Sequence, residues 1–366
     1  MAQRPKILFI LHMPPPVHGA AMVGKYIHDS ELINSEFECY YINLTTAASL
    51  EDIGRASFRK LWAYVKLLTT IWQVVRQVIP DLVYVTPNAK GGAFYKDFIV
   101  VEMLKMMGCR VVAHYHNKGV STRQDRWIDN LLYRKFFRGV KVILLGKSLY
   151  KDVEKYVKWE DVYICPNGIP VTTAPLPEKK QNSIPRLLFL SNLLESKGVF
   201  VLLDALKMLK DKDYSFICDF VGGETAEIDV HRFQEEVHQR GLDRACLYQG
   251  KKYGKEKDVA YQQADIFVFP TGNDCFPLVL LEAMQHGLPC ISTNEGAISD
   301  IVDDGMTGYI VETQNADHLA AKIEKLIIDK QKRMDMGMNG YRKFQERFTL
   351  DVFEKRMHDV LYLFSC

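Results

Sequence analysis

The sequence predicts an α/β protein made of two parallel-sheet domains. The chain has 366 residues, enough for two domains at about 100–200 residues each. Hydrophobic residues make up 48% and charged residues 25%, as in soluble globular proteins, which argues against a disordered, collagen-like or coiled-coil chain. Short apolar runs alternate with longer amphipathic stretches, and strands joined by helices form parallel sheets through right-handed βαβ units.

Eight apolar runs are expected to be strands, and they lie at 6–11, 81–86, 110–115, 141–145, 186–190, 216–221, 266–269 and 289–292. Helical periodicity predicts helices at 20–33, 58–78, 93–107, 199–209 and 317–328. The alternation pauses between 167 and 185, where Pro, Thr and polar residues indicate a linker. We therefore expect a first domain at 1–168, a linker at 169–185 and a second domain at 186–349. Ligands are expected in a cleft at the carboxyl ends of the strands.

The composition also bears on location. The apolar stretch at 67–75 is far shorter than the roughly 20 residues of a membrane span, so no transmembrane helix is expected. The first apolar run resembles a signal peptide, but it soon meets His12 and three prolines, which favours a first β-strand. Eight cysteines without a CxxC pair suggest neither a zinc site nor a disulfide framework. A reducing cytoplasm fits these features.

The net charge of +2 conceals two oppositely charged parts. Residues 1–168 hold 23 Lys and Arg against 15 Asp and Glu, whereas the remainder hold 24 against 30. The basic part is expected to face an anionic glycan, a lipid diphosphate or a membrane surface. Two stretches, 58–79 and 126–141, are rich in basic and aromatic residues. They either dock on an anionic lipid surface or form helices that cover the domain and pack one face against its core. No nucleic-acid recognition module accompanies them.

Two glycine-rich stretches are not phosphate-binding P-loops. The stretch from Gly19 to Lys25 ends in Tyr26 where a Ser or Thr should hold Mg²⁺, and the one before Lys147 has Lys141 where the first glycine belongs. A GxGxxG dinucleotide fingerprint is also absent. The Gly19 segment is either a tight turn only or a loop that lets a ligand approach the amides at a helix N-terminus.

The segment 272–289 is the most informative one. A strand ends, a polar loop carries Asp274, and an apolar helix runs from about Pro277 to His286. Glu282 lies within this apolar helix, where an unpaired buried carboxylate would be costly. Its carboxylate could accept hydrogen bonds from a ribose diol while the helix amides hold phosphate oxygens. The alternative is that Glu282 is a solvated helix residue and Asp274 a cap or turn residue.

Several segments carry a family resemblance. The run from Asp274 through Glu282 to NEGAISDIVDDGMTGYIVE at 294–312 resembles the carboxylate, seven residues, carboxylate motif and the glycine-rich segment of family-4 retaining glycosyltransferases with the GT-B fold. Other matching segments are the glycine loop at 18–19, HYHN at 114–117, CPNG at 165–168, SNLLESKG at 191–198, VGGE at 221–224 and YQQADIFVFPT at 261–271. The resemblance implies two Rossmann-like domains facing a central cleft, with a last helix at 350–366 that packs back on the first.

The resemblance also implies roles for individual residues. Glu282 would bind the ribose of a nucleotide-sugar donor, and Asp274 would contact sugar hydroxyls and support the anomeric centre. Lys197 would neutralise the diphosphate together with the backbone amides of Phe276 and Leu278. His116, at the end of a strand, would contact the transferred sugar or the acceptor, whereas His114 is read as a structural residue. The remaining donor-side residues are Gly19, Asn192 and Gly222, and the last of these would border the base with residues 250–253.

Three positions depart from the family pattern. Asp274 and Asp300 stand where the family has glutamate, and Asn192 stands where an arginine commonly shares the diphosphate with the lysine. An amide supplies neither the charge nor the bidentate fork of a guanidinium. Diphosphate binding is therefore expected to depend on Lys197 and the helix dipole.

Together these features predict a metal-independent, retaining hexosyltransferase without a cofactor, since no DxD motif follows a strand in the required place. It would transfer a sugar from a nucleotide-sugar donor to a glycan or lipid-linked acceptor in bacterial cell-surface polysaccharide or lipopolysaccharide synthesis. A cytoplasmic location is expected, and the protein could in addition bind peripherally to the inner face of the membrane. The alternatives are a nucleotide-sugar epimerase or hydrolase of the same fold, and a non-catalytic nucleotide-sugar-binding subunit, which Asn192 makes plausible.

Overall fold

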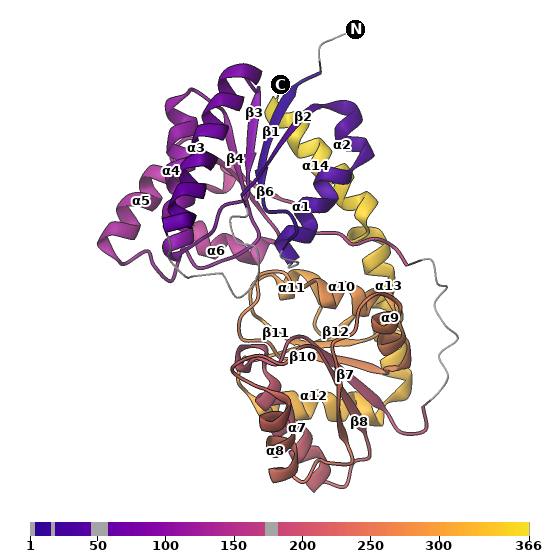
Figure 1. Cartoon of the computed structure of the whole chain (residues 1–366). Helices are drawn as coiled ribbons and strands as arrows, with labels where there is room; N and C mark the ends of the chain where they lie inside the picture. The colour runs from indigo at the N-terminus through magenta and orange to yellow at the C-terminus, as the bar shows by residue number, and fades with distance from the viewer. Residues whose placement is uncertain (1–3, 16–18, 45–57, 173–181, 366) are drawn as a thin grey trace. The chain divides into compact units, whose positions relative to one another are not determined.

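The computed structural model describes residues 4–15, 19–44, 58–172 and 182–365. It divides into two compact units: unit 1 comprises Met1–Gly168 and Leu350–Cys366, and unit 2 comprises Ile169–Thr349. Each unit contains one six-stranded parallel sheet with helices on both faces (Figure 1). The predicted α/β fold class is confirmed. Of the expected linker at 169–185, residues 173–181 lie outside the described residues.

The sheet of unit 1 has the strand order β2-β1-β3-β4-β5-β6. Its strands are β1 (Lys6–Leu11), β2 (Glu38–Asn43), β3 (Leu82–Val85), β4 (Val111–Tyr115), β5 (Lys141–Leu144) and β6 (Val162–Ile164). The inner strands β3 and β4 are buried along their whole length, as expected for continuous apolar runs in a parallel sheet.

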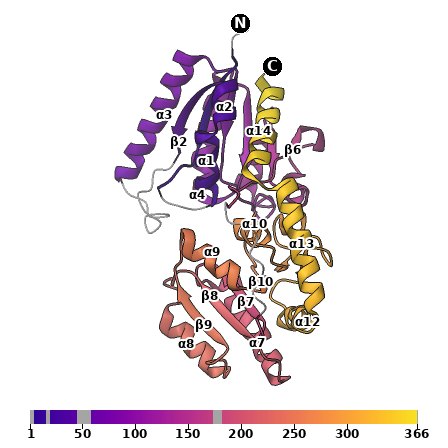
Figure 2. The ribbon, with the colours of Figure 1, turned by 90° about the vertical axis from the view of Figure 1, so that its right-hand side faces the viewer.

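The helices of unit 1 are α1 (Gly19–Asp29), α2 (Glu31–Glu36), α3 (Phe58–Val78), α4 (Gly91–Met106), α5 (Trp127–Phe137), α6 (Tyr150–Val153) and α14 (Leu350–Ser365). Helices α3, α4 and α5 lie on one side of the sheet, and α1, α2 and α14 lie on the other (Figures 1 and 2). Short 3₁₀ turns lie at Lys147–Leu149 and Trp159–Asp161.

The single helix predicted at 20–33 is wrong, because two helices occupy this stretch. Helix α1 ends at Asp29, and Ser30 caps α2 by accepting a hydrogen bond from the amide of Ile33 at 3.3 Å. A serine side chain that binds an amide three residues ahead favours a new helix start over continuation of the previous helix.

The last helix, α14, completes the core of unit 1. Its buried side chains Phe353, Met357 and Leu361 join a cluster that includes Phe9 and Val23. The spacing of four residues places all three on one face of the helix, which explains how a segment that follows unit 2 in the sequence is built into unit 1.

Unit 2 has the strand order β12-β11-β10-β7-β8-β9. The strands are β7 (Arg186–Leu190), β8 (Ile217–Val221), β9 (Cys246–Gly250), β10 (Ile266–Phe269), β11 (Cys290–Thr293) and β12 (Gly308–Val311). The helices are α7 (Val199–Asp211), α8 (Val230–Gln239), α9 (Gly254–Gln263), α10 (Leu278–Gln285), α11 (Ile298–Ile301), α12 (Ala316–Ile328) and α13 (Lys330–Arg347), with a 3₁₀ turn at Glu195–Lys197. Helices α7, α8 and α12 lie on one face of the sheet, and α10 and α11 on the other (Figure 1).

Each sheet changes its direction of growth once. In unit 1 the chain adds β2 on one side of β1 and then β3 on the other; in unit 2 it adds β8 and β9 on one side of β7 and then β10 on the other. Loops at such a switch point lead to opposite faces and leave a crevice at the carboxyl ends of the strands, where open α/β sheets bind ligands. For unit 2 this crevice lies where β7 and β10 end.

Candidate active site

The loops after β7 and β10 bring the two charged residues predicted for catalysis together. Lys197 ends the 3₁₀ turn that follows β7, and Asp274 lies in the loop between β10 and α10. The Nζ atom of Lys197 is 2.6 Å from Oδ2 of Asp274 and also donates to the carbonyl of Asn273 at 3.0 Å. Their side chains are only 21% and 20% exposed, so the pair is partly shielded from water.

Neighbouring loops fix the position of Asp274. The hydroxyl of Thr271 donates to the Asp274 carboxylate at 3.3 Å, and the amide of Ala297 donates to the carbonyl of Cys275 at 2.8 Å. Gly296 has φ +56°, and a Cβ there would lie 2.4 Å from the carbonyl oxygen of Asp274. Only glycine fits a left-handed residue pressed so closely against another backbone. The glycine-rich segment after β11 thus buttresses the Asp274 loop.

Glu282 is held by two side chains of α9, which precedes it in the chain. Lys257 Nζ is 2.6 Å from Oε1, and the hydroxyl of Tyr261 donates to Oε2 at 2.8 Å. Lys257 and Tyr261 are four residues apart and therefore share one face of α9. Glu282 is 19% exposed, and the alternative of a freely solvated helix residue does not describe it. Burial and the neighbouring Glu282 carboxylate raise the pKa of Tyr261 well above its usual range, so this hydroxyl stays protonated and donates.

Helix α10 begins one residue later than expected. Leu278 is its first residue, and Pro277 is an extended N-cap without a side-chain cap. Phe276, just before the helix, is buried and packs edge-on against Phe348. The N-terminus of α10 and its amides follow directly after the Asp274 loop, so the positive end of the helix lies at the same carboxyl edge of the sheet.

Asn192 and Gly222 pack the loops after β7 and β8 against each other. The Oδ1 atom of Asn192 accepts a hydrogen bond from the amide of Gly223 at 3.2 Å. At Gly222 a Cβ would lie 1.7 Å from the carbonyl oxygen of Ser191, so no side chain fits there. The Asn192 amide is therefore engaged with backbone.

The predicted site residues of unit 1 lie at the carboxyl ends of its strands. Gly19 is the first residue of α1, after β1, while His18 lies outside the described residues. His116 directly follows β4, and its ring is 4.2 Å from that of His114. His114 is fully buried and shares a 2.6 Å hydrogen bond with the hydroxyl of Tyr84. Burial lowers the pKa of His114 well below its usual range, as expected for a neutral structural histidine.

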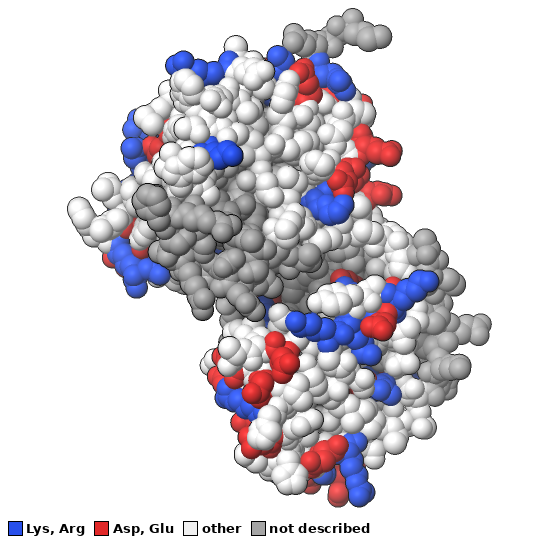
Figure 3. Space-filling model, in the orientation of Figure 1, with Lys and Arg blue, Asp and Glu red and all other residues white. Residues whose placement is uncertain are grey.

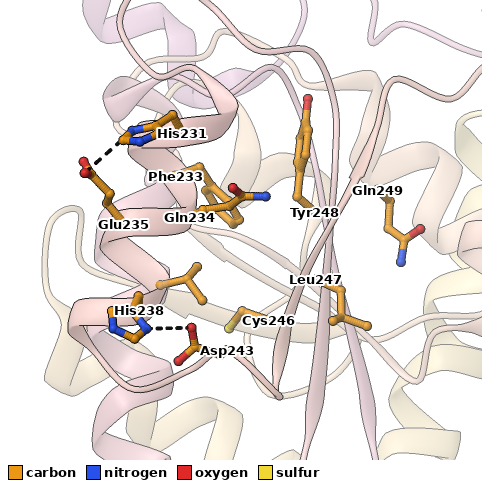
Figure 4. Close-up of a pocket in the computed structure, with 11 residues that line it drawn as sticks. His231, Phe233, Gln234, Glu235, His238, Asp243, Cys246, Leu247, Tyr248 and Gln249 are labelled. Carbon is orange, nitrogen blue, oxygen red and sulfur yellow. Dashed lines mark hydrogen bonds and ion pairs between the residues drawn. The ribbon is translucent and has the colours of Figure 1, made fainter.

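A hollow of about 670 Å³ lies apart from these residues. It opens between α8 and the edge strand β9, and its rim carries His231 with Glu235 and His238 with Asp243 (Figure 4). None of the residues predicted for donor binding lines it. Across residues 4–15, 19–44, 58–172 and 182–365, no three His, Cys, Asp or Glu side chains are grouped as metal ligands.

The partners of Glu282 are what the sequence reasoning missed. The motifs assign no role to Lys257, and they include Tyr261 only as the first residue of YQQADIFVFPT at 261–271. The cost of burying the Glu282 carboxylate was the available signal, because it requires a donor or a cation nearby. The spacing of four residues between Lys257 and Tyr261, in a helix before β10, could have supplied the candidates.

Comparison with known proteins finds sequence similarity mainly in the second unit. Residues 170–343 match the family model of glycosyl transferases group 1. The capsular polysaccharide biosynthesis glycosyltransferase CapM of Staphylococcus aureus is 27% identical over 176 residues, 48% of this chain and 45% of that protein. The D-inositol 3-phosphate glycosyltransferase of Corynebacterium aurimucosum is 30% identical over 155 residues, 41% of this chain and 36% of that protein. The chain thus spans less than half the length of these curated relatives.

Solved structures share the fold over the whole chain. Anabaena HepE in complex with UDP superposes with a TM-score of 0.75 at 16% identity, covering 98% of this chain and 99% of that one. The lipopolysaccharide outer core galactosyltransferase WaaB, in its apo form, has the same TM-score, identity and coverage. These likenesses confirm the GT-B fold that the sequence resemblance implied. Residues 170–343 of this chain thus match the glycosyl transferases group 1 model within a chain that has the GT-B fold.

Proposed function

We propose that the chain is a retaining glycosyltransferase that takes a sugar from a nucleotide-sugar donor bound to unit 2. The observation that carries this proposal is the meeting of Lys197 and Asp274, 2.6 Å apart, at the switch point of the sheet and just before the N-terminus of α10. A cation and a helix N-terminus at one edge suit a diphosphate, and a carboxylate beside them suits sugar hydroxyls or a developing positive charge.

Each residue then has a distinct task. When the bond between the anomeric carbon and the diphosphate breaks, negative charge grows on the leaving oxygen and the sugar becomes oxocarbenium-like. Lys197 and the first amides of α10 stabilise the leaving oxygen, and Asp274 stabilises the sugar. Glu282, fixed by Lys257 and Tyr261, accepts hydrogen bonds from the ribose hydroxyls. The departing diphosphate is stabilised without a divalent metal, so full activity in EDTA is the expected result.

The acceptor is assigned to unit 1, whose strands end near Gly19 and His116. We propose a glycan or lipid-linked acceptor of bacterial cell-surface polysaccharide synthesis, in line with the names of CapM, a capsular polysaccharide biosynthesis glycosyltransferase, and WaaB, a lipopolysaccharide outer core galactosyltransferase. His116 would contact the transferred sugar or this acceptor. A cytoplasmic location, with peripheral attachment to the membrane, follows from such an acceptor. None of the helices within the described ranges is long and apolar enough to cross a bilayer.

The first experiment is a thermal-shift screen with UDP, GDP and ADP, followed by donor turnover with the corresponding nucleotide sugars. We expect one diphosphate to stabilise the protein, and Lys197→Ala and Glu282→Ala each to abolish turnover while each variant remains folded at the assay temperature. Full activity in both variants would contradict the site assignment. Product formed without an acceptor would indicate an epimerase or hydrolase, and donor binding without turnover on any acceptor would indicate a binding subunit.

A further inference from the structure

We propose that Lys251 supplies the second cation of the diphosphate site, the charge that Asn192 does not provide. This inference rests on the proposed donor site. It assigns a role in diphosphate binding to Lys251, which follows β9 at the far edge of the sheet from β12. The family resemblance only implied that residues 250–253 border the base.

The first step is the geometry over Gly223. A Cβ at Gly223 would lie 2.2 Å from Cε and 3.2 Å from Nζ of Lys251, so the end of this lysine occupies the space above the glycine. The same point is 3.0 Å from Oδ1 of Asn192. The Cβ position of Gly223 is thus close to both Nζ of Lys251 and Oδ1 of Asn192. These two atoms therefore lie no more than about 6 Å apart. A lysine that starts at the end of β9 thus reaches across the end of β8 to the loop after β7.

The second step is the charge balance of the site. Lys197 is paired with Asp274 and Lys257 with Glu282, both at 2.6 Å, so each of these lysines is neutralised by its own carboxylate. In the part of the chain that the structure describes, no carboxylate lies within ion-pair distance of Lys251. Glu224, next to Gly223, is exposed and accepts a hydrogen bond from the amide of Val230. Lys251 is thus a lysine at this edge whose charge no carboxylate of the described residues matches, and its ammonium lies over Gly223.

The third step is the electrostatic requirement. A nucleoside diphosphate carries more than one negative charge, and charge-assisted contacts to phosphate oxygens are the stronger kind of hydrogen bond. Asn192 uses its oxygen on the backbone of Gly223 and supplies no charge. Lys251 is exposed and has a long, flexible side chain, so its ammonium can move toward the phosphates as they bind. Gly223 thus makes room for the lysine.

The experiment compares Lys251→Met with Lys255→Met, a matched control four residues further along. Lys255 is also exposed and has no carboxylate within ion-pair distance among the described residues, but it lies on the first turn of α9. Affinities for UDP, GDP and ADP are measured by calorimetry, and those for uridine, guanosine and adenosine by NMR titration. We expect Lys251→Met to weaken binding of the preferred diphosphate about tenfold, to leave its nucleoside unaffected and to flatten the salt dependence. Lys255→Met should behave like the wild type, and Lys251→Arg should keep most of the diphosphate affinity.

Two results would overturn the assignment. Unchanged diphosphate affinity in Lys251→Met would remove Lys251 from the site, and an equal loss for diphosphate and nucleoside would make it part of the base pocket instead. If the wild-type protein binds none of the three diphosphates, the donor site itself is wrong. Failure of the donor site can be distinguished from failure of the Lys251 assignment, because the first is seen with the wild-type protein and the second only with the variant.

Discussion

At the residue scale, two lysine–carboxylate pairs characterise the donor side of unit 2. Lys197 with Asp274 and Lys257 with Glu282 have side chains only 19–29% exposed. At this depth the loss of one partner is costly, because the other charge remains partly desolvated. Exposed pairs elsewhere on the unit, such as Lys207 with Asp211 on α7, are expected to contribute little.

Lys257→Met tests this difference. Glu282 would keep only the Tyr261 hydroxyl, so we expect the free energy of unfolding to fall by about 1–3 kcal/mol. Diphosphate affinity should fall as well, because the proposed ribose-binding carboxylate loses its orientation. Urea denaturation and calorimetry measure the two effects. The control Lys207→Met should stay within about 0.5 kcal/mol of the wild type. Equal effects in the two variants would show that Lys257 is an ordinary surface lysine.

At the scale of elements, helix α14 and helix α4 contribute to unit 1 in different ways. Helix α14 returns from unit 2 to bury three apolar side chains in the core of unit 1. Helix α4 buries Asp97, whose carboxylate accepts hydrogen bonds from the amide and side chain of Asn88 at 2.7 and 2.8 Å. One contribution is apolar packing, and the other is a polar contact that depends on pH.

Two leucines of α14 give a matched comparison. Leu361 is fully buried, whereas Leu363, two positions away, is 59% exposed. We expect Leu361→Ala to destabilise the protein by about 2–5 kcal/mol and Leu363→Ala by less than about 0.5 kcal/mol. Denaturant unfolding followed by fluorescence measures both. A small effect for Leu361→Ala would mean that α14 is not part of the cooperative core.

Asp97 predicts a specific pH dependence. Burial raises its pKa to about 6, above the usual 3.8, and the Asn88 hydrogen bonds only partly offset this. Between pH 4 and 6 the unfolded chain releases this proton while the folded protein keeps it, so its contribution falls as pH rises. The loss is roughly 3 kcal/mol by pH 7. Urea denaturation from pH 4 to 7 should show the wild type losing stability relative to Asp97→Asn. The exposed control Asp125→Asn should show no such trend, and a pH-independent difference for Asp97→Asn would contradict the expectation.

At the scale of the whole molecule, the two units differ in net charge, and unit 1 carries exposed tryptophans. With α14 counted in unit 1, that unit holds 25 Lys and Arg against 18 Asp and Glu, and unit 2 holds 22 against 27. Blue groups are spread over the side of unit 1 where α3, α4 and α5 lie, and both colours are mixed on the visible face of unit 2 (Figure 3). Trp62 on α3 is 66% exposed, and Trp127 and Leu131 on α5 are 78% and 56% exposed. We propose that this α3–α5 face attaches to an anionic lipid surface.

Vesicle sedimentation tests this proposal. We expect binding to vesicles of phosphatidylglycerol and phosphatidylcholine, release as salt is raised, and weak binding to phosphatidylcholine alone. Trp127→Ser should weaken binding several-fold because an interfacial aromatic anchor is lost. Trp159→Ser, a 50% exposed tryptophan outside α3–α5, serves as the control. Salt-independent binding, or equal binding to neutral vesicles, would count against the electrostatic interpretation.

The sequence predicted the inner strands of both sheets and missed the outer ones. All eight predicted strands are present, and the four that were missed, β2, β6, β9 and β12, are the four edges. Inner strands are buried on both faces and read as continuous apolar runs, whereas an edge such as β2 is only partly buried and carries polar residues. Apolar runs alone therefore reveal the middle of a parallel sheet.

Prediction of the site had a similar limit. The motif spacing pointed to Asp274, Glu282 and Lys197, but not to the residues that hold them. Lys257 is 25 positions from Glu282, and Lys197 is 77 positions from Asp274. No local pattern links residues so far apart. The burial of Glu282 indicated that a partner was needed without indicating which one.

The sequence by itself determined the fold class, the family resemblance and the residue types of the donor site, because these follow from local apolar periodicity and from motifs within short segments. Only the tertiary structure decided which strands lie at the edges, that α14 belongs to unit 1, and which lysine is paired with which carboxylate. These features depend on contacts between distant segments. The position of Lys251 over Gly223 is of the same kind, because it exists only once β8 and β9 lie side by side.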